Sequence, residues 1–182
     1  MKKLIYGFFF ISIGLVMFSS CADDQNFDQF EDLSVQPTVA SSIFYFESDE
    51  STINIAGTGL FYSQIFTFEA FNESFVADRI LDGVITYQVE NTTTKELRIV
   101  VDFLGIDGTI LDSESFNVQP SPAPLLERQM AYGANGKSLD ILRNTTDIRV
   151  SGENLGDATS TSPLLEPKII LRSSAEFRLR LR

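Results

Sequence analysis

Apolar and polar residues alternate in short runs from residue 42 to the end of the chain, and turn-forming residues separate these runs. A period of two is that of a β-strand with one buried face, and closely spaced turns join antiparallel strands. The runs are residues 42–47, 64–69, 84–90, 96–104, 109–118, 125–131, 147–153, 168–172 and 176–182. We therefore predict one all-β domain over residues 42–182, an antiparallel β-sandwich with one or two short helices.

The strongest signal for connectivity lies at residues 84–118. Three runs are joined there by two short turns, residues 91–95 and 105–108, and the second turn contains the hairpin pair Asp107-Gly108. This arrangement predicts a three-stranded meander. Its pattern is similar to that of immunoglobulin-like and fibronectin-like sandwiches.

Other segments give local predictions. Residues 52–55 fit a short strand, residues 70–81 fit one or two helical turns, and Ser138 can cap a short helix that ends near residue 143. In the second run Phe66 and Phe68 point to the same face, and we expect both to be buried.

The composition excludes several kinds of chemistry. The chain has 182 residues, no histidine, no tryptophan and one cysteine. The lack of histidine excludes every His-dependent triad and most zinc sites, and a single cysteine excludes internal disulfides and cysteine-ligated clusters. Twenty-five acidic and 14 basic residues give a net charge of −11, which disfavours binding to nucleic acid. We expect no cofactor and no metal.

The first residues have the pattern of a secretory signal peptide. Lys2 and Lys3 precede an apolar run of 15 residues, 4–18. A membrane-spanning helix needs roughly 20 apolar residues, so the run is short for a span and suits the hydrophobic region of a signal peptide. We assign residues 1–20 to this peptide.

The apolar run ends in Phe18-Ser19-Ser20-Cys21, which resembles the lipobox of bacterial lipoproteins of the Bacteroidota type. The usual pattern has Leu in place of Phe18 and Gly or Ala in place of Ser20. The resemblance implies cleavage before Cys21 and acylation of its sulfur and its amino group. The membrane is then a partner through these acyl groups, since several chains make a durable tether. The alternatives are a signal-anchor cysteine and a buried free thiol.

Residues 21–41 form an acidic segment without basic residues or clear periodicity. As a coil this segment predicts a flexible tether of roughly 25 Å. Surface-exposed lipoproteins of the Bacteroidota carry an acidic export signal directly after the acylated cysteine, and the resemblance makes Asp23 and Asp24 candidates for that signal. The alternative is a solvated spacer. The whole chain is similar to uncharacterised flavobacterial lipoproteins, which have no assigned activity to transfer.

Charge is divided unevenly along the chain. Residues 21–94 carry 13 acidic residues and one basic residue, whereas residues 95–182 carry 12 acidic and 11 basic residues. In the last run Arg178, Arg180 and Arg182 alternate with apolar residues. We expect these cations to pair across strands with acidic residues of the first half. The alternative is a docking edge for an anionic partner or for a partner's strand.

Four carboxylates are near one another in the sequence and come closest to a catalytic pair: Asp102, Asp107, Asp112 and Glu114. Asp107 falls in a turn, and Asp112 and Glu114 share a strand face that we expect to be exposed, so we interpret the set as solvated. Glycan binding would need exposed aromatic platforms, for which Tyr45 is the candidate. We expect no enzymatic activity.

These patterns together predict an outer-membrane lipoprotein whose β-sandwich serves binding or structure, on the cell surface rather than the periplasmic face. The alternative is a periplasm-facing accessory subunit of an envelope secretion, motility or uptake complex. No pattern in the sequence identifies a protein or glycan partner.

Overall fold

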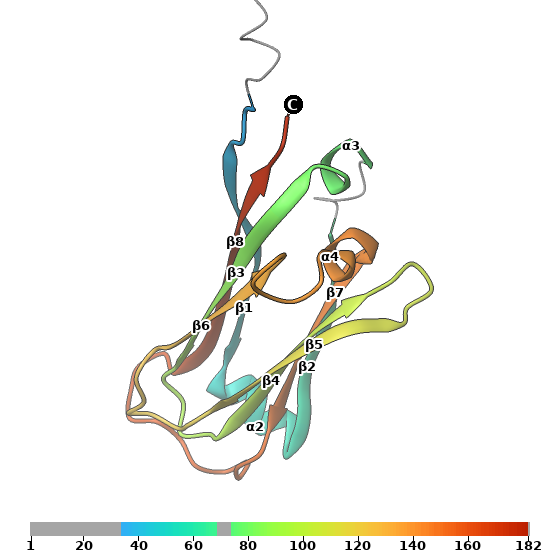
Figure 1. Ribbon diagram of the computed structural model, residues 1–182. Coiled ribbons are helices and arrows are strands. Elements are labelled where there is room, and N and C mark those ends of the chain that lie inside the picture. Colours follow the sequence, from blue (N-terminus) through green and yellow to red (C-terminus); the bar gives the residue numbers. More distant parts are fainter. Residues whose placement is uncertain (1–33, 69–73, 182) are drawn as a thin grey trace, which may run out of the picture. The chain divides into compact units, whose positions relative to one another are not determined.

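The computed structural model describes residues 34–68 and 74–181. These residues form two four-stranded antiparallel sheets that pack face to face, with the orders β1-β8-β3-β6 and β2-β7-β4-β5 (Figure 1). The strands are β1 (Thr38–Asp49), β2 (Gly59–Thr67), β3 (Ile80–Asn91), β4 (Leu97–Leu104), β5 (Ile110–Val118), β6 (Leu126–Tyr132), β7 (Asp147–Asn154) and β8 (Lys168–Leu179). The predicted antiparallel β-sandwich is confirmed.

The strands pair as one long hairpin that is rolled into two sheets. β4 pairs with β5, β3 with β6, β2 with β7 and β1 with β8. The further pairs β3–β8 and β4–β7 complete each sheet. This eight-stranded arrangement is a jelly roll, whose connectivity differs from that of the immunoglobulin fold. The predicted likeness to immunoglobulin-like sandwiches therefore extends only to the two-layer architecture.

The predicted meander is wrong in its first step. β4 and β5 form the expected hairpin, and Gly108, with φ of 78°, lies in its turn. β3 and β4 lie in different sheets, because the connection between them crosses from one sheet to the other. The buried Asn91 amide holds this crossing by donating to the carbonyl oxygens of Lys95 (2.8 Å) and Gln119 (2.9 Å). Alternation of apolar and polar residues identifies the buried face of a strand but does not indicate which strand lies beside it.

The helices are short: α2 (Glu50–Ala56), α3 (Ser74–Ala77) and α4 (Leu139–Asn144). The predicted cap of α4 is confirmed, because the Ser138 hydroxyl accepts the N–H of Asp140 at 3.1 Å. α2 replaces the strand predicted at residues 52–55. Ile53 is fully buried while Ile55 is 88% exposed, and these two side chains would share a face in a strand. No helix within the described ranges is long and apolar enough to cross a membrane.

The end of the predicted tether belongs to the sandwich. β1 begins at Thr38 rather than at residue 42, and the N–H groups of Leu179 and Leu181 donate to the carbonyl oxygens of Pro37 and Val35 at 3.0 Å. The two runs predicted at the C-terminus form the single strand β8. The predicted signal peptide and the first part of the tether lie outside the described residues.

The core fills the space between the sheets and ends, on the side of β1 and β2, in a row of rings that we call the aromatic seam: Phe44, Phe46, Phe61, Tyr62 and Phe66. The ring centroids of Phe46 and Tyr62 lie 3.9 Å apart. Of the two rings predicted to be buried, Phe68 is 5% exposed, but Phe66 is only half-buried. Phe66 is less buried because β2 is an edge strand, which among the described residues has a neighbouring strand, β7, on one side only.

Replacing Phe68 by alanine tests how this part of the chain faces the core. We expect Phe68→Ala to lower the free energy of unfolding by about 3–5 kcal/mol, because truncating a buried ring leaves a cavity. Ile65 is 57% exposed, so Ile65→Ala, the control, should change it by less than about 1 kcal/mol. Urea denaturation of both variants measures the difference. Equal losses of unfolding free energy would contradict the assignment of Phe68 to the buried face and Ile65 to the exposed face.

Candidate functional site

The predicted anchor and export residues, Cys21, Asp23 and Asp24, lie outside the described residues. Within residues 34–68 and 74–181, no group of three or more His, Cys, Asp or Glu side chains could hold a metal ion. The candidate sites below are therefore ion-pair clusters, pockets and exposed apolar surfaces of the sandwich.

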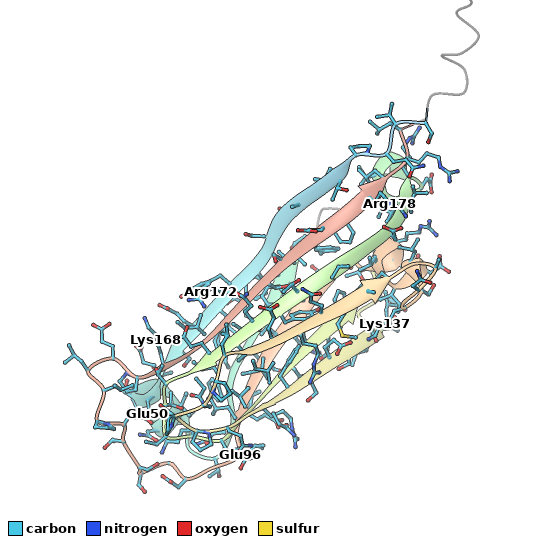
Figure 2. All side chains as sticks on the ribbon, turned by 60° about the vertical axis from the view of Figure 1, so that its left-hand side comes forward. Glu50, Glu96, Lys137, Lys168, Arg172 and Arg178 are labelled. Carbon is cyan, nitrogen blue, oxygen red and sulfur yellow. The ribbon has the colours of Figure 1, made fainter. Side chains whose placement is uncertain are left out.

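β8 places the cations of the second half of the chain between two strands from the acidic first half (Figure 2). The ion pairs are Lys168–Glu47 (3.4 Å), Arg172–Glu90 (3.5 Å) and Arg178–Asp82. The Arg178 guanidinium lowers the pKa of the Asp82 carboxyl. The expected cross-strand pairing is confirmed for Arg178. Exposed pairs of this kind contribute less than about 1 kcal/mol each.

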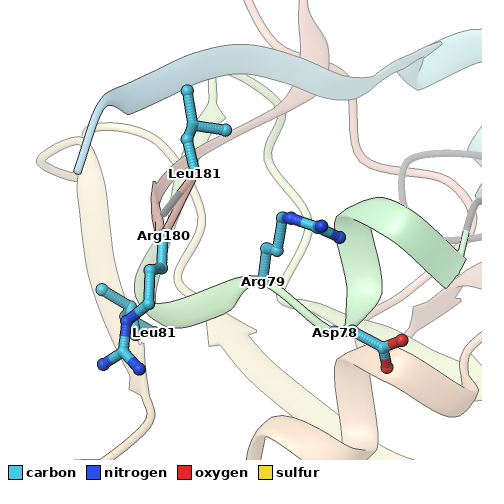
Figure 3. A pocket seen from close by; sticks show the side chains of 5 residues that line it. All are labelled: Asp78, Arg79, Leu81, Arg180 and Leu181. Carbon is cyan, nitrogen blue, oxygen red and sulfur yellow. The ribbon is translucent and has the colours of Figure 1, made fainter. Parts of the chain in front are cut away.

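Arg180 lies just beyond β8, in a pocket of about 380 Å³ that Asp78, Arg79, Leu81 and Leu181 also line. The N–H of Arg180 donates to the carbonyl oxygen of Arg79 at 2.8 Å, which fixes the two backbones together. Figure 3 shows that the two guanidinium groups point in different directions. The pocket therefore lacks the convergent cations that an anionic ligand requires.

The carboxylate of Asp102 is occupied by its neighbours. It accepts from Arg149 at 2.7 Å (Nη2) and 3.1 Å (Nε), and from the Ser113 hydroxyl at 2.7 Å. Asp107 accepts from the hydroxyl of Thr109 (2.7 Å), and this bond lowers the pKa of Asp107. Both carboxylates serve local structure.

Asp112 and Glu114 face the interior, which corrects the expected exposed face. They lie on the same face of β5 as the fully buried Phe116, and Glu114 is 6% exposed. The Lys137 ammonium bonds both carboxylates, at 2.6 Å for Asp112. On β6, Arg128 lies 3.8 Å from Glu114 and 4.6 Å above the Phe116 ring. These contacts of Lys137 and Arg128 with Asp112, Glu114 and Phe116, which we call the charge clamp, join β6 and the loop that follows it to β5 of the other sheet.

The tyrosines offer a single exposed ring among those described. Tyr45 is 51% exposed and donates its hydroxyl to Glu47 at 2.5 Å. Tyr87 and Tyr132 are buried beside the charge clamp, where burial and the nearby carboxylates raise the pKa of both hydroxyls. One exposed ring provides one stacking surface for a sugar.

Two buried charges, which the sequence pattern did not reveal, anchor the loops at one end of the sandwich. Lys95 is fully buried, and its ammonium donates to Asp157 (3.0 Å) and to the hydroxyl (2.6 Å) and carbonyl (2.8 Å) oxygens of Ser160. Glu50 is 3% exposed and accepts from the N–H groups of Thr94 (2.5 Å) and Ser162 (2.7 Å). Lys95 is the last residue of a polar turn and Glu50 is the first residue of α2, so neither belongs to an alternating run that would indicate burial.

Helix α2 and the loop between β7 and β8, which these charges hold, carry an exposed apolar surface. Ile55 is 88% exposed, Leu165 97% and Leu164 50%, and we call these three residues the apolar tip. They line an open pocket of about 770 Å³, with Asp49 and Glu166 among its other residues. In the β1–β8 ladder Asp49 pairs with Lys168 at this end and Thr38 with Arg178 at the other. The apolar tip therefore lies opposite the end where the chain enters the sandwich.

No protein-family model and no curated protein sequence matches this chain at a significant level. Among solved structures it is similar to the VP2 subviral particle of infectious bursal disease virus, at 11% identity and a TM-score of 0.40 over 80% of this chain and 33% of the viral chain. It is also similar to a protein of Parabacteroides distasonis described as secreted, at 9% identity and a TM-score of 0.45 over 63% of this chain and 36% of the other.

A third similar structure is that of Triatoma virus, at 11% identity and a TM-score of 0.39 over 76% of this chain and 63% of the viral chain. This chain spans about a third of the length of the first of these proteins, the VP2 chain. At these identities and TM-scores the likeness carries no inference about the function of this chain.

Replacing Glu50 tests the buried network through its pH dependence. Burial alone raises the pKa of Glu50, but the hydrogen bonds from Ser162 and Thr94 outweigh burial and hold the pKa below its usual value. A carboxylate with a lowered folded pKa stabilises the fold above its ordinary pKa of about 4.3, and this stabilisation is lost as the pH falls through the folded value. We expect Glu50→Gln to lower the free energy of unfolding at neutral pH by about 1–3 kcal/mol.

The same variant should lose less stability than the wild type as the pH is lowered through the carboxylate range, because it has lost the titrating group. Urea denaturation as a function of pH measures both effects. Glu96→Gln, at an exposed carboxylate, is the control and should follow the wild type. Identical pH profiles of Glu50→Gln and the wild type would contradict the role assigned to Glu50.

Proposed function

We propose that this chain is a lipoprotein, anchored in the outer membrane through acyl groups on Cys21, whose β-sandwich is a non-catalytic binding or structural domain on the cell surface. The observation that carries this proposal is the place at which the N-terminal part of the chain enters the sandwich. Val35 and Pro37 bond to the end of β8, and the apolar tip lies at the opposite end of the same strands. An anchor upstream of residue 34 is thus attached to the end remote from the tip.

We also propose that the domain is not catalytic, and this is supported by the partners that already bind the candidate carboxylates. Asp102 is held by Arg149 and Ser113, and Asp112 and Glu114 are bound by Lys137. A general acid or base needs access to its substrate. Each of these carboxylates is instead engaged by a partner from a neighbouring strand or loop.

The apolar tip supports a binding role. Ile55 on α2 and Leu164 and Leu165 between β7 and β8 line the same pocket, and an exposed group of apolar side chains is typical of a protein contact. The bonds of the buried Lys95 and Glu50 to Ser160 and Ser162 fix the loop between β7 and β8 against the start of α2. Buried charges are costly to desolvate, so their hydrogen bonds make alternative loop positions unfavourable.

The second candidate function is that of a periplasm-facing accessory subunit of an envelope complex. The tip favours this function as much as the first, because it would serve contact with a membrane-protein partner equally well. The two functions differ in the side of the outer membrane on which the sandwich lies.

Replacing the anchor cysteine tests the lipoprotein assignment. Because Cys21 is the only cysteine in the chain, Cys21→Ala should abolish incorporation of a labelled fatty acid. Ser20→Ala brings the segment closer to the usual lipobox and should keep the label, so it is the control. Equal labelling of wild type and Cys21→Ala would overturn the lipoprotein assignment.

Protease treatment of intact cells tests the side of the membrane. We expect digestion of the wild type and protection of the double variant Asp23→Ala, Asp24→Ala, because the candidate export signal is acidic. Detection uses an antibody to the sandwich, and fatty-acid labelling of the variant should be unchanged. The control is Asp28→Ala with Asp32→Ala, which removes the same charge further along the tether and should leave the sandwich exposed. Protection of the wild type, with digestion only after lysis, would favour the periplasmic function.

A further inference from the structure

The pocket at the apolar tip has an acidic lining. Three carboxylates line it, Asp49, Glu50 and Glu166, and its described lining residues include no lysine or arginine. Glu50 is buried among its hydrogen bonds, so the charges that face the solvent are those of Asp49 and Glu166, both of which are exposed. We call these two residues the acidic rim. The pocket therefore combines apolar side chains with negative charge.

The acidic rim has no cation of its own. Within residues 34–68 and 74–181, neither Asp49 nor Glu166 forms an ion pair or a side-chain hydrogen bond. Lys168, two residues beyond Glu166, bonds Glu47 at 3.4 Å, so these two charges offset each other. Other exposed carboxylates on the strands have arginine partners. A charge that the rest of the chain leaves uncompensated is available to a cationic partner.

The parts of the chain outside the described ranges are too short to cover the tip. Residues 69–73 start and end at the opposite end of the sandwich, where Thr67 pairs with Asp147, and five residues cannot extend the roughly 30 Å of β2 and return. Residues 22–33, between the proposed anchor and the described chain, span at most roughly 40 Å, which only equals the length of β1. Cover for the tip therefore has to come from another molecule.

We propose that the apolar tip and its acidic rim bind a protein segment that carries lysine or arginine beside apolar side chains. This inference rests on the binding role proposed above for the tip and adds the chemistry of the partner. Apolar side chains of the segment cover Ile55, Leu164 and Leu165, and its cations pair with Asp49 and Glu166.

Charge is the reason for choosing a cationic protein rather than a membrane surface. Apolar groups that insert into a bilayer interface are typically accompanied by lysine and arginine, which anionic headgroups attract. The same headgroups would repel the acidic rim. A second copy of this chain is disfavoured as well, because the net charge is −11 and two identical acidic rims would meet.

Selection from a peptide library tests this chemistry on the purified full chain in detergent. The probe is a phage-displayed library of short random peptides. We expect the enriched peptides to combine lysine or arginine with leucine, isoleucine or phenylalanine. Their binding should weaken as salt is raised, because salt screens exposed charges. Enrichment of acidic or uncharged peptides, or of none, would overturn the proposal.

Two variants separate the contribution of the rim from that of the tip. Asp49→Asn with Glu166→Gln should weaken binding of an enriched peptide about tenfold, which is roughly what two exposed ion pairs contribute together. Ile55→Ser with Leu165→Ser should abolish binding without any change in charge. Equal binding by the wild type and the rim variant would overturn the assigned role of the carboxylates.

The control for these variants removes the same charge elsewhere. Asp78→Asn with Glu176→Gln changes two exposed carboxylates towards the end at which the chain enters, and should bind like the wild type. Equal weakening by this control and by the rim variant would reduce the effect to net charge and overturn the proposal. None of these outcomes bears on the anchor, which fatty-acid labelling of Cys21→Ala tests separately.

A benzophenone attached to the cysteine of Ser51→Cys tests the same contact in cells. Ser51 is exposed and lines the pocket but belongs to neither the tip nor the rim. We expect a polypeptide adduct whose cross-linked segment is basic and apolar, at several-fold higher yield than from Ile106→Cys, which is 92% exposed in the β4–β5 turn. A lipid adduct without a polypeptide adduct would show that the tip contacts the membrane, and would overturn the proposal.

Discussion

The insertion of β8 between β1 and β3 is the interaction on which the rest of the sandwich depends. β8 is the last strand in the chain, yet it occupies an inner position and pairs with both neighbours over nearly its whole length. Its inward residues Ile169 and Leu171 are fully buried, while its outward cations meet acidic residues of the first half. Burial supplies most of the stabilisation, because exposed ion pairs contribute little. The ion pairs favour the observed neighbours and register over alternatives in which acidic strands would face one another.

In the described part of the chain, the strand ladders do not join the two sheets at either side of the sandwich, and different contacts close the two sides. On one side Lys137 and Arg128 bridge the layers by binding Glu114, which would otherwise be a buried charge without a partner. On the other side, aromatic rings from β1 and β2 pack together, with Phe44 and Phe66 centroids 5.6 Å apart. On the charged side, the acidic residues of β5 have their partners within the same chain. On the aromatic side, Phe61, Tyr62 and Phe66 are only half-buried and lie on β2, an edge strand without charged residues.

The loop end is organised by buried polar groups. Lys95 and Glu50 come from different segments, and each holds part of the loop that follows β7, through Ser160 and Ser162. The neighbouring Asp157 carboxylate accepts from the N–H groups of Ser160 and Thr159 and from Lys95, and these bonds hold its pKa far below the usual range. Partnered charges restrict the loops more strongly than apolar contacts would, because each lost hydrogen bond leaves a desolvated charge. The apolar tip is therefore presented on a fixed base.

The sequence by itself determined most of the strands, since alternation around residues such as Phe116 and Leu171 follows directly from the two faces of a pleated strand. The sequence also excluded histidine-dependent chemistry, because the chain has no histidine. It determined the uneven division of charge between the two halves of the chain, which β8 brings together as ion pairs. Only the tertiary structure decided which strands are neighbours, that Asp112 and Glu114 face inward, and that Lys95 and Glu50 are buried. These features depend on contacts between residues far apart in the chain. Local periodicity reports the environment of one strand face, whereas a buried charge is stable only where a distant segment supplies its partner.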